Sequence, residues 1–188
     1  MVADVALRKI TFAEFRQMEF DDDDPFQYEL LDGEIVQKSS PNPYHQRASR
    51  EITVAIHLHV RQNKLGEVFY SPIDVVLDDY NVPQPDVVFL TTDQANLVTR
   101  DGIMGVPTMV AEIISPSSVI RDRKQKYAIY ERFGVAEYWL VDVAHQEIEI
   151  YALENGQYSL FSAASVLEGT LQSNVLPDLR LDLKTLFG

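Results

Sequence analysis

Apolar residues recur at spacings of three and four along the first part of the chain, which predicts helices. The longer helix is expected at residues 44–64, where one face is formed by Ala48, Ile52, Ala55, Ile56 and Val60. A shorter helix is expected to begin at Thr11, because Thr11 and Glu14 have the spacing of a capping box. Four adjacent carboxylates at residues 21–24 repel one another and favour a solvated loop after it.

Short apolar runs between these segments predict the strands of a sheet. A hairpin is expected at residues 28–38 around Asp32-Gly33, and a second one at 148–161 around Asn155-Gly156. Further strands are expected at 68–77, 87–90, 109–114 and 138–141, and a third helix is expected to end at Gly134. Residues 91–107 resemble an exposed connection, and the C-terminal segment resembles a closing strand and a helical turn. Strands that alternate with helices predict an α/β fold.

The length and composition predict an ordinary globular protein. A chain of 188 residues suits a single domain over residues 1–188 with one hydrophobic core. The absence of cysteine excludes a disulfide scaffold or a cysteine-based zinc site, and it agrees with an expected cytoplasmic location. No apolar run reaches the length of about 20 residues that a membrane span requires, so no membrane association is expected.

The charge of the chain is strongly negative but unevenly placed. A formal net charge of -13 argues against indiscriminate binding to nucleic acid, because phosphate contacts supply most of the non-specific affinity. Nine of the 16 basic residues nevertheless lie in two segments, which predicts either a local basic face or two solvated helix faces. They are Arg47, Arg50, Arg61 and Lys64 in one segment, and Arg121, Arg123, Lys124, Lys126 and Arg132 in the other.

Two carboxylates occupy unusual positions in the predicted strands. Asp86 follows Pro85 at the start of one strand, and Glu112 lies inside another strand whose neighbours are all apolar. An unpaired buried charge is very costly, so Glu112 needs a cation, a proton or a set of donors. The helix that follows carries Asp122, Lys126 and Tyr130 at a spacing of four residues, which places all three on one stripe.

These groups suit metal-assisted phosphoryl transfer. Mg²⁺ prefers oxygen ligands, which Asp86, Glu112 and the backbone carbonyl of Ile113 can supply. The metal would polarise a phosphate and lower the pKa of a bound water. Lys126 would orient that water or neutralise charge on the phosphate. Its ordinary pKa of about 10.4 argues against a general base, and simple pairing with Glu112 or Asp122 is the alternative.

Several motifs in one order and spacing give the chain a family resemblance. They are Tyr28-Glu29-Leu30-Leu31-Asp32-Gly33-Glu34, Ser40-Pro41 with His45, Pro85-Asp86, Glu112-Ile113-Ile114-Ser115-Pro116-Ser117-Ser118, Asp122 with Lys126 and Tyr130, and Gly134-Val135-Ala136-Glu137-Tyr138-Trp139-Leu140-Val141-Asp142. With these motifs the chain resembles the Uma-two family of restriction endonucleases, within the restriction-endonuclease-like superfamily whose signature is PD-(D/E)XK. The resemblance covers a core of about residues 10–160.

The resemblance implies a restriction-endonuclease-like core, with a mixed central sheet flanked by helices, an N-terminal hairpin and a C-terminal β extension. It also implies a Mg²⁺ (or Mn²⁺) ion, nucleic acid as substrate with DNA expected, phosphodiester hydrolysis and a homodimer. Asp86 and Glu112 match the acidic positions of the signature. The signature lysine is replaced by Ile114, and Lys126 on the next helix matches the lysine of the Uma-two pattern.

Other roles stay open in the sequence. His45 matches a family histidine that would contact metal or phosphate, although local hydrogen bonding at a helix N-terminus explains it equally well. Either Glu29 or Glu34 could add a metal ligand. A catalytically silent binding or assembly module is the alternative to a nuclease, and Ile114 favours it. A hydrolase that uses Asp86 and Glu112 as an acid and base pair, as glycosidases do, is a third reading.

Overall fold

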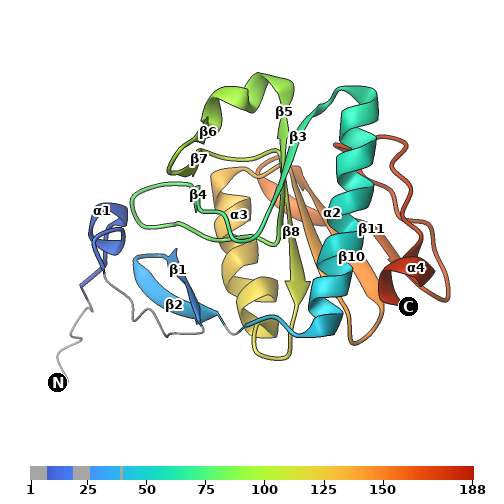
Figure 1. Ribbon diagram of the computed structural model, residues 1–188, viewed down its shortest axis with the longest axis horizontal. Helices are drawn as coiled ribbons and strands as arrows, with labels where there is room; N and C mark the ends of the chain where they lie inside the picture. Colours follow the sequence, from blue (N-terminus) through green and yellow to red (C-terminus); the bar gives the residue numbers. More distant parts are fainter. Residues whose placement is uncertain (1–7, 19–25, 39) are drawn as a thin grey trace.

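The centre of the computed structural model is a six-stranded mixed sheet in the order β11-β10-β9-β8-β5-β3 (Figure 1). The structure describes residues 8–18, 26–38 and 40–188, so the predicted acidic loop at 21–24 lies outside it. Strands β8 and β9 are parallel, and every other neighbouring pair in this sheet is antiparallel. The strands are β3 (Gly66–Tyr70), β5 (Val87–Thr91), β8 (Met109–Ile114), β9 (Glu137–Asp142), β10 (Glu147–Glu154) and β11 (Gln157–Ser165).

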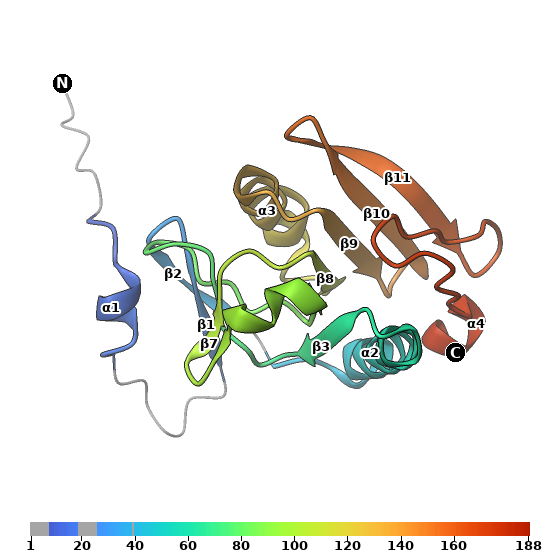
Figure 2. The ribbon, with the colours of Figure 1, turned by 90° about the horizontal axis from the view of Figure 1, so that it is seen from above.

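Helices cover both faces of this sheet (Figure 2). Helix α2 (Pro43–Asn63) packs its buried side chains, among them Ile52 and Ile56, against one face together with α4 (Leu183–Phe187). On the other face lies the helical segment formed by η2 (Arg121–Lys126), whose turns are wide π-helical turns, and α3 (Tyr127–Phe133). Because both faces are covered, β8 and β9 are buried at every position. The predicted mixed sheet flanked by helices is confirmed.

The N-terminal elements form a small layer beside α3 (Figure 1). The capping box at Thr11 is present and begins α1 (Phe12–Phe15). Strands β1 (Gln27–Leu31) and β2 (Glu34–Lys38) form the predicted hairpin, whose turn residues Asp32 and Gly33 both have positive φ. Such a turn favours an Asp-Gly pair.

Three expectations about individual segments differ from the structure. Residues 91–107 are mostly exposed, as expected, but they form regular elements and not a plain connection. η1 (Thr92–Leu97), β6 (Val98–Thr99) and β7 (Gly102–Met104) fold back, and β6 and β7 join β4 (Val75–Val76) in a small sheet around the buried Ile103. The expected strand at 68–77 is split into β3 and β4 by the turn at Ser71-Pro72. The closing strand does not form between β11 and α4, although Leu176 and Leu179 of that segment pack into the core. No helix in the described ranges is long and apolar enough to cross a membrane.

A buried glutamate attaches the C-terminal segment to β9. Glu137 is fully buried, and its Oε1 accepts hydrogen bonds from Trp139 Nε1 (2.6 Å) and Ser173 Oγ (2.7 Å). Its Oε2 accepts from the backbone N–H groups of Asn174 (2.6 Å) and Val175 (3.3 Å). Four donors therefore satisfy this carboxylate, and its role is structural.

Replacing this residue should destabilise the fold. In Glu137→Ala four donors lose their acceptor, and we expect the free energy of unfolding to fall by at least about 3 kcal/mol, since hydrogen bonds to charged groups contribute about 1.5–3 kcal/mol each. Thermal unfolding followed by the emission of Trp139 would measure it. The exposed Glu154 is the control, and Glu154→Ala should change stability by less than about 0.5 kcal/mol. Equal stability of the two variants would contradict this role.

Candidate active site

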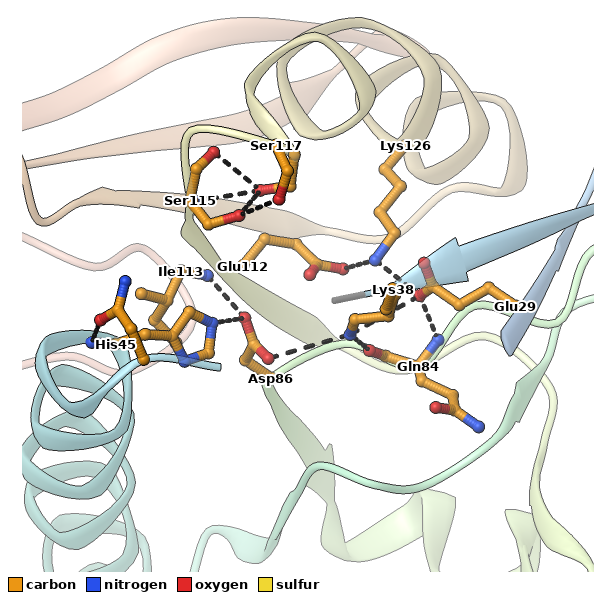
Figure 3. A network of polar contacts seen from close by, with 12 residues as sticks. Glu29, Lys38, His45, Gln84, Asp86, Glu112, Ile113, Ser115, Ser117 and Lys126 are labelled. Atoms are coloured by element: carbon orange, nitrogen blue, oxygen red, sulfur yellow. Dashed lines mark hydrogen bonds and ion pairs between the residues drawn. The ribbon is translucent and has the colours of Figure 1, made fainter. Parts of the chain in front are cut away.

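A cavity of about 570 Å³ opens where β5, β8, the N-terminal half of α2 and the η2 segment meet, and Asp86, Glu112, Lys126 and His45 all line it. Asp86 directly precedes β5, and its Oδ2 accepts a hydrogen bond of 2.8 Å from the backbone N–H of Ile113 in β8 (Figure 3). This bond joins the two neighbouring strands at the floor of the cavity. The structure therefore brings together the five residues that the sequence suggested as catalytic groups or metal ligands: Asp86, Glu112, Ile113, Lys126 and His45.

His45, near the start of α2, lies beside Asp86. Its backbone N–H donates to the Oδ1 of Asn42, the residue that caps α2, at 3.0 Å. Its Nε2 lies 3.3 Å from Asp86 Oδ2. The backbone of His45 thus makes the local hydrogen bond expected at a helix N-terminus. Its ring faces Asp86 and the cavity, where a metal or phosphate contact was the other interpretation. The buried Nδ1 has no hydrogen-bond partner among the residues that the structure describes.

A buried lysine lies between two glutamates on the side of the cavity opposite His45 (Figure 3). Lys126 is 1% exposed, and its Nζ is 2.8 Å from Glu112 Oε1 and 2.7 Å from Glu29 Oε1. Tyr130 donates its hydroxyl to the same Glu112 oxygen at 2.8 Å. The stripe predicted for Asp122, Lys126 and Tyr130 is buried and faces this cluster. The wide turns of η2 carry two of its members, and such turns are frequent at functional sites.

One residue of this cluster, Glu29, was left open in the sequence beside Glu34, and another, Lys38, was missed. Glu29 is fully buried on β1 and also accepts a hydrogen bond from the backbone N–H of Gln84 at 2.7 Å, whereas Glu34 is exposed. Glu112 was noticed because it is a carboxylate beside apolar residues in a strand. The same signal is present at Glu29, and it could have favoured Glu29 over Glu34. Lys38 Nζ donates to the carbonyl of Gln84 at 2.7 Å and lies 3.9 Å from both Glu29 and Asp86. No sequence signal marked that lysine.

The protonation of the cluster follows from burial and from an excess of carboxylates. Burial raises the pKa of Glu112 to about 8, and Asp122 and Asp86 add to the effect while Lys126 opposes it. Burial likewise raises the pKa of Asp122. For Asp86, burial is outweighed by the hydrogen bond with His45 and the charge of Lys38, so its pKa lies below the ordinary value.

Lys126 remains an ammonium group in this environment. Burial alone would lower the pKa of Lys126, but Glu112, Glu29 and Asp122 outweigh that effect and the pKa lies above its ordinary value. A general-base role needs a lowered pKa, so the electrostatics argue against it.

The donor set suits a divalent cation. Four buried carboxylates, Glu29, Asp86, Glu112 and Asp122, face two lysines, so the cluster carries a net charge of -2 when all are ionised and His45 is neutral. Oε2 of Glu29 is buried and has no hydrogen-bond partner in the described part of the chain. Carboxylate oxygens are the ligands that Mg²⁺ and Mn²⁺ prefer. One such ion would balance the charge.

Another acidic group lies at the end of β9, outside this cavity. Asp142, His145 and Glu147 are close enough to share a metal ion, and among the described residues they form one group of three such side chains. The guanidinium of Arg123 already lies 3.7 Å from Asp142 and 3.9 Å from Glu147. The side chain of His145 is 73% exposed. Arg123 therefore offsets part of the negative charge of this group.

Together, the sheet order and the acidic cavity at β5 and β8 define a protein of restriction-endonuclease-like fold. The chain belongs to the Uma2 family, described as "Putative restriction endonuclease", whose sequence model matches residues 12–184. This confirms the resemblance found in the motifs.

One solved structure agrees with this fold, and a second is similar over a smaller part. A "putative nuclease belonging to DUF820" from Anabaena variabilis ATCC 29413 is 20% identical and superimposes with a TM-score of 0.76, over 95% of this chain and 97% of that one. The type IIG restriction endonuclease BpuSI is 13% identical, with a TM-score of 0.43 over 77% of this chain and 15% of that one. No curated protein matches the chain.

Proposed function

We propose that the protein is a Mg²⁺-dependent nuclease that hydrolyses phosphodiester bonds of nucleic acid, with Asp86 and Glu112 as its metal ligands. The observation that carries the proposal is the buried ammonium group of Lys126, which is hydrogen-bonded to Glu112 beside Asp86 in one cavity. A lysine next to two acidic residues is the combination expected for metal-assisted phosphodiester hydrolysis. Membership of the Uma2 family supports the same conclusion.

Each residue has a role that follows from its position. Asp86, Glu112 and the carbonyl of Ile113 would hold the ion, which when bound would lower the pKa of a water and neutralise phosphate charge. Lys126 stabilises negative charge on the phosphate, because it stays protonated between its two glutamates. Glu29 positions the ammonium group of Lys126. Tyr130 positions the carboxylate of Glu112. His45 orients Asp86 through Nε2.

The position of the lysine supports a nuclease over a silent module. Ile114 occupies the signature position and is 6% exposed in a hydrophobic cluster, so it supplies no charge. Lys126 reaches the neighbourhood of Glu112 from the helix instead, which supports the nuclease over a catalytically silent binding or assembly module. DNA as the substrate, Mn²⁺ as an alternative ion and a homodimer belong to the same proposal.

Cleavage of defined substrates tests the proposal. We expect the purified protein to cleave at least one member of a panel of single- and double-stranded DNA and RNA in Mg²⁺ or Mn²⁺. EDTA should abolish the cleavage, and added metal should restore it. Cleavage that persists in EDTA would contradict the metal requirement. Metal binding without cleavage of any substrate would support the silent module.

The pKa of Glu112 predicts a pH-dependent metal affinity. Since Glu112 has a pKa of about 8, its proton must leave before the carboxylate binds a metal. The affinity for Mg²⁺ should therefore rise about tenfold per pH unit below pH 8 and level off above it. Calorimetric titration at several pH values would measure this. Glu112→Gln should bind more weakly and lose the dependence, and a pH-independent affinity in the wild type would refute it.

A further inference from the structure

A second cavity lies further along the same face of α2 as the active-site cavity. The active-site cavity is lined by Arg50 and Val54 of this helix, and the second, of about 410 Å³, is lined by His57, Arg61 and Lys64. At 100° per residue the four helical positions, Arg50, Val54, His57 and Arg61, fall within an arc of about 60°. They extend along about 17 Å of the helix axis, and Lys64 follows as the residue that caps the helix.

The edge strand β3 forms the opposite wall. Tyr70 at its end lines the active-site cavity, and Gly66, Glu67 and Val68 at its start line the second cavity. Both ribbon views show β3 beside α2 (Figures 1 and 2). We call the surface between α2 and β3, from Arg50 and Tyr70 to Lys64, the α2–β3 trough. Arg50 and Tyr70 at one end of the trough line the active-site cavity.

The trough concentrates positive charge on an acidic protein. The exposed side chains of Arg61 and Lys64 form no ion pair with any residue that the structure describes, and Arg50 pairs with the adjacent Glu51 at 2.7 Å. Glu67 is the acidic residue among those that line the second cavity.

The other basic segment is largely committed elsewhere. Lys126 is buried, Arg123 pairs with Glu149 and Arg132 pairs with Asp32. Arg121 and Lys124 of this segment, like Arg61 and Lys64, form no ion pair with any residue that the structure describes. Arg61 and Lys64 are the two that line the second cavity.

We propose that one unpaired nucleic-acid strand enters the active site and continues along the α2–β3 trough, with phosphates on Arg61 and Lys64 and a base stacked on Tyr70. This inference rests on the proposed nuclease function and names its substrate as single-stranded. The side chains of Asp86 and Glu112 are almost entirely buried, so a phosphate must descend into the cavity to reach them. Tyr70 is 65% exposed at the mouth of that cavity, and stacking on an aromatic ring requires a base that is free of its partner.

Binding without cleavage tests the trough directly. Fluorescence anisotropy would measure the affinity of the wild type for a labelled single-stranded DNA 12-mer in EDTA at about 50 mM salt. In Arg61→Ala/Lys64→Ala the affinity should fall about tenfold, and the slope of log affinity against log salt should decrease by about 1.4, because about 0.7 counterions are released per phosphate contact. Arg180→Ala/Lys184→Ala removes the same charge from exposed positions that line neither cavity, and it should bind within twofold of the wild type.

A matched pair of tyrosines tests the stacked base. Tyr70→Ala should lower the affinity about tenfold. Tyr44→Ala should not, because Tyr44 is 66% exposed and does not line the cavity. A 12-base-pair duplex should bind at least tenfold more weakly than the single strand.

Each outcome separates this inference from the proposed function. Metal-dependent cleavage together with unchanged binding in Arg61→Ala/Lys64→Ala would overturn the trough and leave the nuclease intact. Loss of binding in that variant without any cleavage by the wild type would support the trough and count against the nuclease. Equal binding of duplex and single strand, or no binding of either, would overturn the inference. Displacement of the 12-mer by polyglutamate at equal charge would make the trough a docking surface for acidic protein segments and would also overturn it.

Discussion

Asp86→Asn is expected to lower metal-dependent cleavage by about a hundredfold to a thousandfold while the fold stays intact. The substitution keeps the shape of the side chain, and its oxygen can still accept the hydrogen bond from Ile113. It removes a negative charge that lies 3.3 Å from His45 and 3.9 Å from Lys38 and that would bind the metal. Electrostatic contributions of single groups in active sites are of this size. Initial rates at saturating Mg²⁺, with the melting temperature as a check of folding, would measure the effect.

The matched control is a carboxylate of nearly equal burial in a different place. Asp142 is 7% exposed, compared with 5% for Asp86, and lies at the end of β9 beside Arg123. Asp142→Asn removes the same charge without touching the cavity, so cleavage should stay at the level of the wild type. If Asp86→Asn cleaved as fast as the wild type, or if both variants lost activity equally, the assignment of Asp86 to the site would be wrong.

Lys126→Met is expected to lower the free energy of unfolding by about 3–5 kcal/mol. Methionine has a similar length but no charge, so Glu29 and Glu112 would face each other without the ammonium group that now lies 2.7 and 2.8 Å from them. Removing one partner of a buried ion pair costs this much because the remaining charge is uncompensated. For a chain of this length the melting temperature should fall by about 6–20 °C. Cleavage should fall by at least about a hundredfold.

The pH dependence of this loss identifies its cause. Two facing carboxylates without a cation have raised pKa values in the folded state, so their destabilising effect is present at high pH and disappears as the pH falls and one of them is protonated. The stability deficit of Lys126→Met should therefore be smaller at pH 5 than at pH 8. Arg132→Met is the control, because Arg132 and Asp32 form an exposed ion pair that contributes less than about 1 kcal/mol. A deficit that is equal at both pH values would show that lost packing, not charge, is responsible.

Two buried glutamates in neighbouring strands have different roles because their hydrogen-bond donors and neighbouring charges differ. Glu112 and Glu137 are both almost completely buried, on β8 and β9. Glu137 receives four hydrogen bonds from fixed donors, so it serves the fold. Glu112 shares Lys126 with Glu29 and keeps a raised pKa, which leaves the cluster in need of a further cation. Burial alone does not distinguish a structural carboxylate from a candidate catalytic one.

The sequence alone determined the features that depend on neighbours along the chain. Helical periodicity placed Lys126 and Tyr130 on one stripe, because residues four apart share a helix face. The hairpin at Asp32-Gly33 followed from the turn that this pair favours. Glu112 was conspicuous because its strand is otherwise apolar. These are local signals, so α/β architecture and the central candidate residues could be predicted.

Only the tertiary structure decided which distant groups meet. Glu29 joins the cluster through Gln84 and Lys126, which are 55 and 97 positions away in the chain, and Lys38 approaches from the end of the hairpin. The fold of residues 92–104 depended on pairing with β4, which no local pattern encodes. The same holds for the basic residues: Arg123 and Arg132 of the second segment met acidic partners across the fold, whereas Arg61 and Lys64 did not. Contacts between residues far apart in the chain are set by packing of the whole core, and local sequence carries no measure of that packing.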